Sequence, residues 1–221
     1  MTTRAVPWWV ALCLVVGSGS HALADPTPLD GTVAVMAQAL ITGSPAQFDG
    51  VTQSTDASLN PISLNAYAES DVNGDFASAF TAITAIWDSA SAGAVYFGES
   101  GFSNASQMSS GSDNLNGSRW TYRFRSNDDA TLTLDYEFDL TPDTTDPTGL
   151  QGIWFVVILG GYEPVVDQVL PPGSSGTITV PLSAGESYAV SLIPLAHFSG
   201  DLGNVTAGMA GSFDWQISEG Q

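Results

Sequence analysis

Residues 130–141 read ATLTLDYEFDLT, and this stretch decides the fold because apolar and polar side chains alternate along it without a break. The apolar set consists of Leu132, Leu134, Tyr136, Phe138 and Leu140. The polar set consists of Thr131, Thr133, Asp135, Glu137 and Asp139. Successive side chains of a β-strand point to opposite faces of a sheet, so the pattern predicts a strand with one buried and one solvated face.

The preceding segment 119–125 (RWTYRFR) repeats the alternation, with Trp120, Tyr122 and Phe124 on its apolar side. The residues between the two segments, 126–129 (SNDD), are typical of a turn. We therefore predict a β-hairpin of 119–125 with 130–141. Its register would place Trp120 opposite Tyr136, and Arg119 opposite Glu137.

Further short strands are predicted along the rest of the chain. Residues 152–159 (GIWFVVIL) are continuously apolar, which is typical of a central strand covered on both faces. The other predicted strands are residues 32–41, 62–70, 77–87, 92–98, 176–183, 186–195 and 212–218, although the alanines of 77–87 would also suit a helix. The polar segment 103–118 is predicted to be a loop. This rhythm predicts an all-β fold, a single antiparallel β-sandwich of jelly-roll-like kind.

The first 24 residues have the features of a cleaved signal peptide. Arg4 supplies positive charge, residues 8–16 (WWVALCLVV) form the apolar region, and residues 22–24 (ALA) form a cleavage site. The apolar run is shorter than the about 20 residues that a membrane-spanning helix needs. We therefore expect residues 25–221 to be one exported domain without stable membrane insertion. It would be secreted to the extracellular space, or periplasmic if not released across an outer membrane.

The chain is strongly acidic, with a formal net charge of −19 at pH 7. Beyond residue 24 it has no lysine and no cysteine, and its arginines are Arg119, Arg123 and Arg125. Disulfides, thiol catalysis, Schiff-base chemistry and the lysine-containing phosphate loop are therefore excluded for the exported domain. Repulsion argues against nucleic acid, anionic lipid and polyanionic glycans as partners, and divalent cations are natural counter-ions.

Residues 71–75 (DVNGD) are the best candidate for a metal site, because clustered oxygen ligands on a tight turn suit calcium. The candidate ligands are Asp71, Asn73 and Asp75. The segment is not an EF-hand loop, since the twelfth position counted from Asp71 is Ala82 instead of glutamate. A plain turn held by aspartate and asparagine side chains is the alternative reading. Calcium is the one cofactor that the sequence suggests.

Two features bear on glycan chemistry. Asp135, Glu137 and Asp139 share a strand face, where neighbouring carboxylates are about 6.6 Å apart, which reaches the window of about 6.5 to 9.5 Å of inverting glycosidases. A solvated strand face is the alternative.

Trp87, at a predicted strand end, is the candidate for stacking on a glycan, whereas the other tryptophans of the domain are expected in the core. His197 is the single histidine beyond residue 24, and no Gly-x-Ser-x-Gly elbow accompanies it.

Residues 182–188 (LSAGESY), the closing segment 211–215 (GSFDW) and the signal peptide resemble the exported PEP-CTERM-type bacterial β-sandwich proteins, over roughly residues 90–218. The resemblance implies a secreted β-domain associated with extracellular polysaccharide. No Pro-Glu-Pro signal, membrane helix or basic tail like that family's follows Ser218, so we expect release. The sequence thus predicts a secreted, non-catalytic protein with a structural or matrix-associated role. The alternative is a carbohydrate-binding module or a glycan hydrolase that uses the acidic strand face. The oligomeric state stays open.

Overall fold

A computed structural model describes residues 24–41, 47–72, 75–103, 108–111, 118–140, 151–200 and 205–219, and no helix occurs among them. The strands in these ranges are β1 (Thr27–Ile41), β2 (Gln47–Thr55), β3 (Ile62–Val72), β4 (Asp75–Ser89), β5 (Ala92–Ser103), β6 (Met108–Gly111), β7 (Arg119–Arg125), β8 (Ala130–Leu140), β9 (Gln151–Leu159), β10 (Glu163–Leu170), β11 (Ser174–Leu182), β12 (Ser187–Gly200) and β13 (Val205–Glu219).

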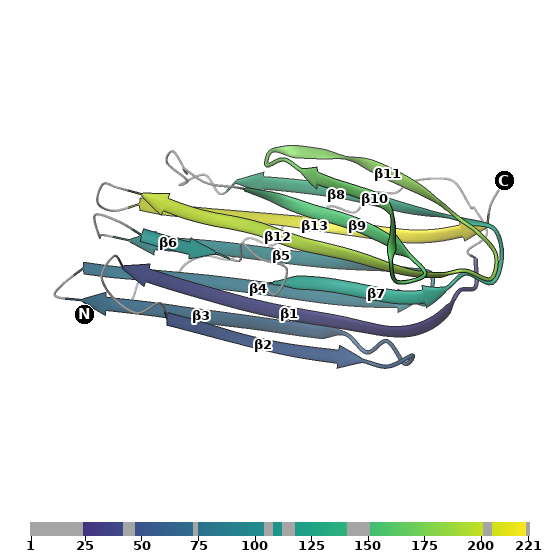
Figure 1. Cartoon of the computed structure of the whole chain (residues 1–221), viewed down its shortest axis with the longest axis horizontal. Coiled ribbons are helices and arrows are strands. Elements are labelled where there is room, and N and C mark those ends of the chain that lie inside the picture. The colour runs from purple at the N-terminus through teal and green to yellow at the C-terminus, as the bar shows by residue number, and fades with distance from the viewer. Residues whose placement is uncertain are drawn as a thin grey trace.

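The strands form two antiparallel sheets that run along the long axis of the molecule and pack against each other (Figure 1). The seven-stranded sheet has the order β10-β9-β12-β6-β1-β2, and β7 also pairs with β1 and β12. The six-stranded sheet has the order β11-β8-β13-β5-β4-β3. The predicted fold class, an all-β antiparallel sandwich, is confirmed.

Aromatic side chains from both sheets fill the space between them. Trp120, Tyr122 and Phe124 of β7 are buried from the seven-stranded sheet, and Trp215 of β13 meets them from the six-stranded sheet. The ring centroids of Tyr122 and Trp215 are 5.0 Å apart. The Tyr122 hydroxyl donates to the carbonyl of Ala90 at 2.7 Å, so the polar end of this buried ring is satisfied. Residues 25–221 contain no cysteine, so no disulfide reinforces this contact and the two sheets depend on their core for stability.

The predicted hairpin of 119–125 with 130–141 is wrong, although both segments are strands. β7 pairs with β1 and β12, so that Trp120 lies opposite Val33 and Leu192, and Arg119 lies opposite Ala34. β8 pairs with β11 and β13 in the other sheet. Both strands turn their apolar faces toward the same core from opposite sides. Alternation therefore identifies the buried face of a strand, but it does not identify the strand's partner.

The turn after β7 crosses from one sheet to the other instead of reversing the chain within a sheet. It is held by backbone hydrogen bonds to the connection between β11 and β12. Ser126 N donates to Glu186 O at 2.9 Å, and Gly185 N donates to Ser126 O at 2.7 Å. These bonds satisfy backbone groups of the turn that a hairpin would have paired internally.

The remaining strand predictions are largely confirmed. Residues 77–87 form part of β4, so the helical alternative for these alanines is wrong. The predicted loop 103–118 contains the short strand β6. β2 and β10 were not predicted, and most of their residues are exposed. β9 is a central strand between β10 and β12, as expected.

A side chain of one sheet caps the exposed edge of the other where β2 and β3 lie together. Asp49 Oδ2 on β2 accepts a hydrogen bond of 2.9 Å from the backbone N–H of Tyr67 on β3. Unpaired edge groups invite pairing with other chains. This contact therefore satisfies one of the groups at that edge.

The predicted signal peptide lies almost wholly outside the described residues and stays a prediction. Ala24, its predicted last residue, is buried and donates its backbone N–H to Ile217 O at 3.2 Å. None of the described segments is a helix with the length and apolar character to cross a bilayer.

Candidate functional site

The outward face of the six-stranded sheet carries exposed carboxylates, and we call it the acidic face. These side chains come from four strands: Asp135, Glu137 and Asp139 on β8, Asp214 on β13, Asp88 on β4, and Glu69 and Asp71 on β3. Arg119, Arg123 and Arg125 lie on β7, in the other sheet. Among the side chains that the structure describes, no arginine lies on the acidic face, which makes this face strongly negative.

Asp135 and Asp214 are directly opposite each other on β8 and β13. Directly opposed residues of an antiparallel pair have Cβ atoms about 4.5 to 5.5 Å apart. The pKa of Asp214 is raised above its usual value. Partial burial is the largest cause, followed by the charge of Asp135 and then by the charge of Asp88. The Thr177 hydroxyl donates to Asp135 Oδ1. The structure thus creates a carboxylate pair that alternation along a single strand could not indicate.

Replacing Asp214 by asparagine is expected to stabilise the protein at neutral pH. A carboxyl whose folded pKa is raised binds its proton more tightly in the folded state than in the unfolded state. The stability that the protonated carboxyl contributes is therefore lost as the pH rises from the pKa of the unfolded state, 3.8, through the raised pKa of the folded state. Urea unfolding of the wild type and Asp214→Asn at neutral pH and below pH 3.8 should show a gain only in the first condition.

Asp128→Asn, in the exposed turn after β7, serves as the matched control because it removes one acid from outside the acidic face. It should leave the two unfolding midpoints nearly unchanged. An equal gain from both substitutions would show that overall charge, and not the opposed pair, sets the effect.

Exposed aromatic side chains lie on the same sheet face as the carboxylates. Tyr67 on β3 and Tyr96 on β5 are 48% and 44% exposed. Phe80 on β4 is half-buried and lies opposite Tyr67. The Tyr67 hydroxyl donates to Glu69 Oε2 at 2.7 Å, which restrains its ring on the surface. We call Tyr67, Phe80 and Tyr96 the aromatic rim.

A row of small residues crosses the sheet between Tyr96, on one side of this rim, and Tyr67 and Phe80, on the other side. Gly98 on β5 lies opposite Ala82 on β4 and Ala210 on β13. A Cβ atom added to Gly98 would meet nothing within 4 Å. Tyr96 stands two residues before Gly98, and Phe80 lies opposite Ser100, two residues after it. At about 3.3 Å per residue, the two sides of the rim are about 13 Å apart along the strands.

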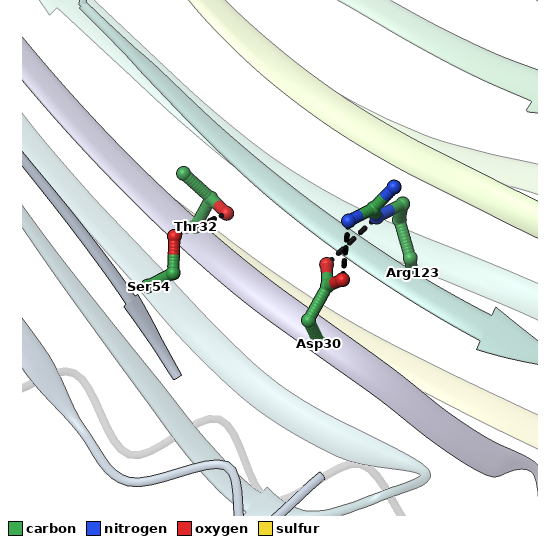
Figure 2. A network of polar contacts seen from close by, with 4 residues as sticks. All are labelled: Asp30, Thr32, Ser54 and Arg123. Carbon is green, nitrogen blue, oxygen red and sulfur yellow. Dashed lines mark hydrogen bonds and ion pairs between the residues drawn. The ribbon is translucent and has the colours of Figure 1, made fainter. Parts of the chain in front are cut away.

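The outward face of the seven-stranded sheet has a different charge pattern. Arg123 on β7 and Asp30 on β1 form a two-point ion pair, in which Arg123 Nε donates to Asp30 Oδ1 at 2.7 Å (Figure 2). Thr32 and Ser54 share a hydroxyl hydrogen bond of 3.0 Å across β1 and β2 (Figure 2). Thr121 and Ser191 repeat this contact across β7 and β12 at 2.9 Å. This face is nearly neutral, in contrast to the acidic face.

Two of the candidate calcium ligands lie at the adjoining ends of two strands, Asp71 near the end of β3 and Asp75 at the start of β4. Asp71 lies opposite Phe76, and Asp75 lies opposite Val72. Because neighbouring pairs alternate between faces, the register directs Asp71 and Asp75 to opposite sides of the sheet. Asn73 lies outside the described residues. Within the ranges that the structure describes, no group of three or more histidine, cysteine, aspartate or glutamate side chains is arranged to hold a metal. Calcium binding stays a prediction.

Trp87, the candidate for glycan stacking, is a core residue with 7% exposure. Its ring centroid is 6.4 Å from those of Trp120 and Tyr122. The strand that carries it continues through Asp88 to Ser89, so Trp87 falls on the inward face and not at an exposed end. This placement corrects the prediction of a platform at Trp87. His197 lies within β12, opposite Gly111 of β6.

No family model matches the chain, and no curated protein matches it. Among solved structures, the chain is similar to the GH31 α-xylosidase from Xanthomonas citri with a TM-score of 0.21 and 7% identity, covering 82% of this chain and 32% of that chain. This chain thus spans about a third of the length of the enzyme. A TM-score this low does not indicate a common fold.

Proposed function

We propose that the protein is a secreted, non-catalytic β-sandwich protein with a structural role in an extracellular polysaccharide matrix. The observation that supports this proposal is the open sheet surface on which the acidic face and the aromatic rim lie together. Asp135, Glu137 and Asp139 are exposed there. A carboxyl that acts as a general acid normally lies in an apolar pocket, which raises its pKa. A surface of this kind suits contact with a long polymer better than enclosure of a small substrate.

The chemistry of the surface favours a neutral polysaccharide as the partner. Exposed aromatic rings such as Tyr67 and Tyr96 offer flat apolar faces to the C–H groups of sugar rings, while carboxylates and hydroxyls beside them accept and donate hydrogen bonds. Anionic glycans would be repelled by the acidic face. The row of small residues at Gly98 leaves the space between the two tyrosines open.

Binding of the purified domain, residues 25–221, to neutral and anionic polysaccharides tests this proposal, with and without calcium. We expect binding to neutral polymers, and a Tyr67→Ala, Tyr96→Ala double variant should weaken it at least about tenfold, which corresponds to about 1.4 kcal/mol. Tyr162→Ala is the matched control, because Tyr162 is also exposed but lies in the turn between β9 and β10. It should bind as the wild type does.

The outcomes separate the possible explanations. No binding to any polymer under either condition would overturn the polysaccharide role. Equal losses in the double variant and in Tyr162→Ala would exclude the aromatic rim as the contact. Binding that appears only with calcium would keep the proposal and support the predicted calcium site at residues 71–75.

Glycan hydrolysis is a second candidate function, and the Asp135–Asp214 pair is the observation that favours it. Retaining glycosidases use two neighbouring carboxyl groups, one of them with a raised pKa, and the strand register places Asp135 directly opposite Asp214, whose pKa is raised. Incubation with the same polymers should then release reducing ends, and Asp135→Asn should abolish the release while Asp128→Asn retains it. Absence of release by the wild type would leave the non-catalytic role.

A further inference from the structure

Residues 24–27 cross from one sheet of the sandwich to the other. At one end of this segment, the backbone N–H of Ala24 donates to Ile217 O of β13, in the six-stranded sheet, at 3.2 Å. At the other end, Thr27 begins β1 and lies opposite Arg125 of β7, in the seven-stranded sheet. β1 begins at the end of the sandwich where β13 ends (Figure 1). These four residues therefore connect the two sheets at this end, and we call them the 24–27 strap.

Ala24 is tied to the folded domain by burial and by both of its backbone polar groups. It is 5% exposed and belongs to the hydrophobic core cluster. Its carbonyl accepts a hydrogen bond from the hydroxyl of Ser91, which is also buried. The backbone N–H of Ile217 donates to Ser91 O at 2.7 Å, so the three residues bond to one another. Loss of Ala24 would leave the buried Ser91 hydroxyl without this acceptor, which destabilises a folded protein.

The rest of the 24–27 strap is held by the turn after β7. Asn127 Nδ2 donates to the carbonyl of Asp25 at 2.5 Å, and the Thr27 hydroxyl donates to Asn127 Oδ1 at 3.1 Å. Asn127 therefore fixes the backbone on the carboxyl side of Ala24. The Ala24–Asp25 peptide bond lies between two anchored carbonyls. Folding thus withdraws this bond from proteases, which cut most readily where the chain is exposed and loosely held.

The sequence offers two cleavage sites for the predicted signal peptide, because two overlapping triplets have the small-x-small pattern. Residues 22–24 (ALA) allow a cut after Ala24, and residues 20–22 (SHA) allow a cut after Ala22. The first cut removes Ala24 and the contacts that it makes with the domain. The second cut retains Ala24 and leaves Leu23 before it, so that the contacts of Ala24 are kept.

We propose that processing removes residues 1–22, so that the exported chain begins at Leu23 and keeps Ala24 as the first residue of the 24–27 strap. A signal peptidase of the host adds water across the Ala22–Leu23 peptide bond, which leaves a carboxylate on Ala22 and a free amine on Leu23. The backbone N–H of Ala24 then remains an uncharged amide. This processing step rests on the predicted signal peptide of the proposed secreted protein, and it is independent of polysaccharide binding.

Export of the full chain, residues 1–221, from a bacterial host tests the proposal. Amino-terminal sequencing and the intact mass of the exported product should give a chain that begins at Leu23. Sequencing reads the cut whether or not the product folds. A product that begins at Asp25, or one that keeps its first 22 residues, would overturn the proposal.

A substitution in the first triplet separates the two cleavage sites. Ser20→Tyr places a large residue at a small position of residues 20–22 and leaves residues 22–24 unchanged. The product that begins at Leu23 should therefore be lost. His21→Tyr is the matched control, because it introduces the same side chain at the middle position, where the pattern sets no size. It should leave the cut after Ala22 in place. Unchanged processing of Ser20→Tyr would contradict the proposal.

Unfolding measurements test the structural role of Ala24 separately from the position of the cut. Residues 23–221 should unfold at a higher urea concentration than residues 25–221, because only the longer chain carries Ala24. Ser91→Ala should lower the midpoint of residues 23–221 but not that of residues 25–221, since Ser91 and Ala24 act as a pair. Equal midpoints for the two unsubstituted chains would overturn the role of Ala24 in the fold, and with it the proposal.

Discussion

We expect Gly93→Ala to destabilise the protein by about 3 kcal/mol or more, at the upper end of what overpacking a core costs. Gly93 lies in β5, where an added Cβ would stand 2.2 Å from the carbonyl oxygen of Ile86 and 2.9 Å from the ring of Trp215. The carbonyl belongs to the backbone of β4, and the Trp215 ring packs against Tyr122. Neither neighbour can move without disturbing the core.

Gly98→Ala on the same strand is the matched control for this prediction. Its Cβ would meet nothing within 4 Å, and its backbone does not require a positive φ. The substitution should be neutral or stabilise by about 0.4 to 1 kcal/mol, since alanine restricts the unfolded chain. Urea unfolding of both variants measures the difference. Similar midpoints for the two would show that β5 does not approach β4 and Trp215 as closely as described.

Phe124→Ala is expected to lower the free energy of unfolding by about 3 to 5 kcal/mol. Phe124 is fully buried, and its ring stacks between those of Tyr122 and Tyr188, with centroids 5.1 and 5.8 Å away. Removing the ring leaves a cavity that these aromatic neighbours cannot fill without leaving their own contacts. A loss of this size approaches the whole stability of many domains.

Chemical denaturation with tryptophan fluorescence checks the prediction, because Trp120 and Trp215 lie in the same core. Tyr96→Ala is the comparison, since it also removes an aromatic ring but from an exposed position. It should change the midpoint only slightly. If the two variants lose stability equally, the cluster around Phe124 is not the main contact between the sheets.

The sequence identifies the buried face of several strands correctly. Leu132, Leu134 and Phe138 are in the core, and Asp135, Glu137 and Asp139 are exposed, as alternation along 130–141 predicts. The same pattern does not identify the partner of each strand. Two strands on either side of a core show the same pattern as two strands in one hairpin, so a turn sequence such as 126–129 fits both arrangements.

The unpredicted strands also have a physical reason. β2 and β10 lie at the two edges of the seven-stranded sheet and expose most of their residues, so neither has a regular apolar face. Residues 47–55 (QFDGVTQST) are nearly all polar or small. β6 has four residues, too few to show a period. Such strands are held by pairing with their neighbours and leave little trace in composition.

The candidate site was only partly accessible from sequence. Alternation along 62–70 places Ile62 and Ala66 inside and therefore Tyr67 outside, and the same reasoning about Val95 and Phe97 exposes Tyr96. That signal was present in the pattern. The pairing of Asp135 with Asp214 leaves no such signal in the sequence. The two residues are far apart in the chain, and they lie opposite each other only because of the register of β8 with β13.

The sheet-to-sheet turn after β7 has a consequence for how the chain acquires its structure. Because β7 and β8 do not pair, their partners come from distant parts of the sequence. Arg123 and Asp30 are 93 residues apart, and Thr121 and Ser191 are 70 residues apart. Folding rates fall as contacts become less local. Neither sheet is complete until β12 and β13, the last two described strands, join it, so the two sheets should form slowly and only after residues 187–219 have been synthesised.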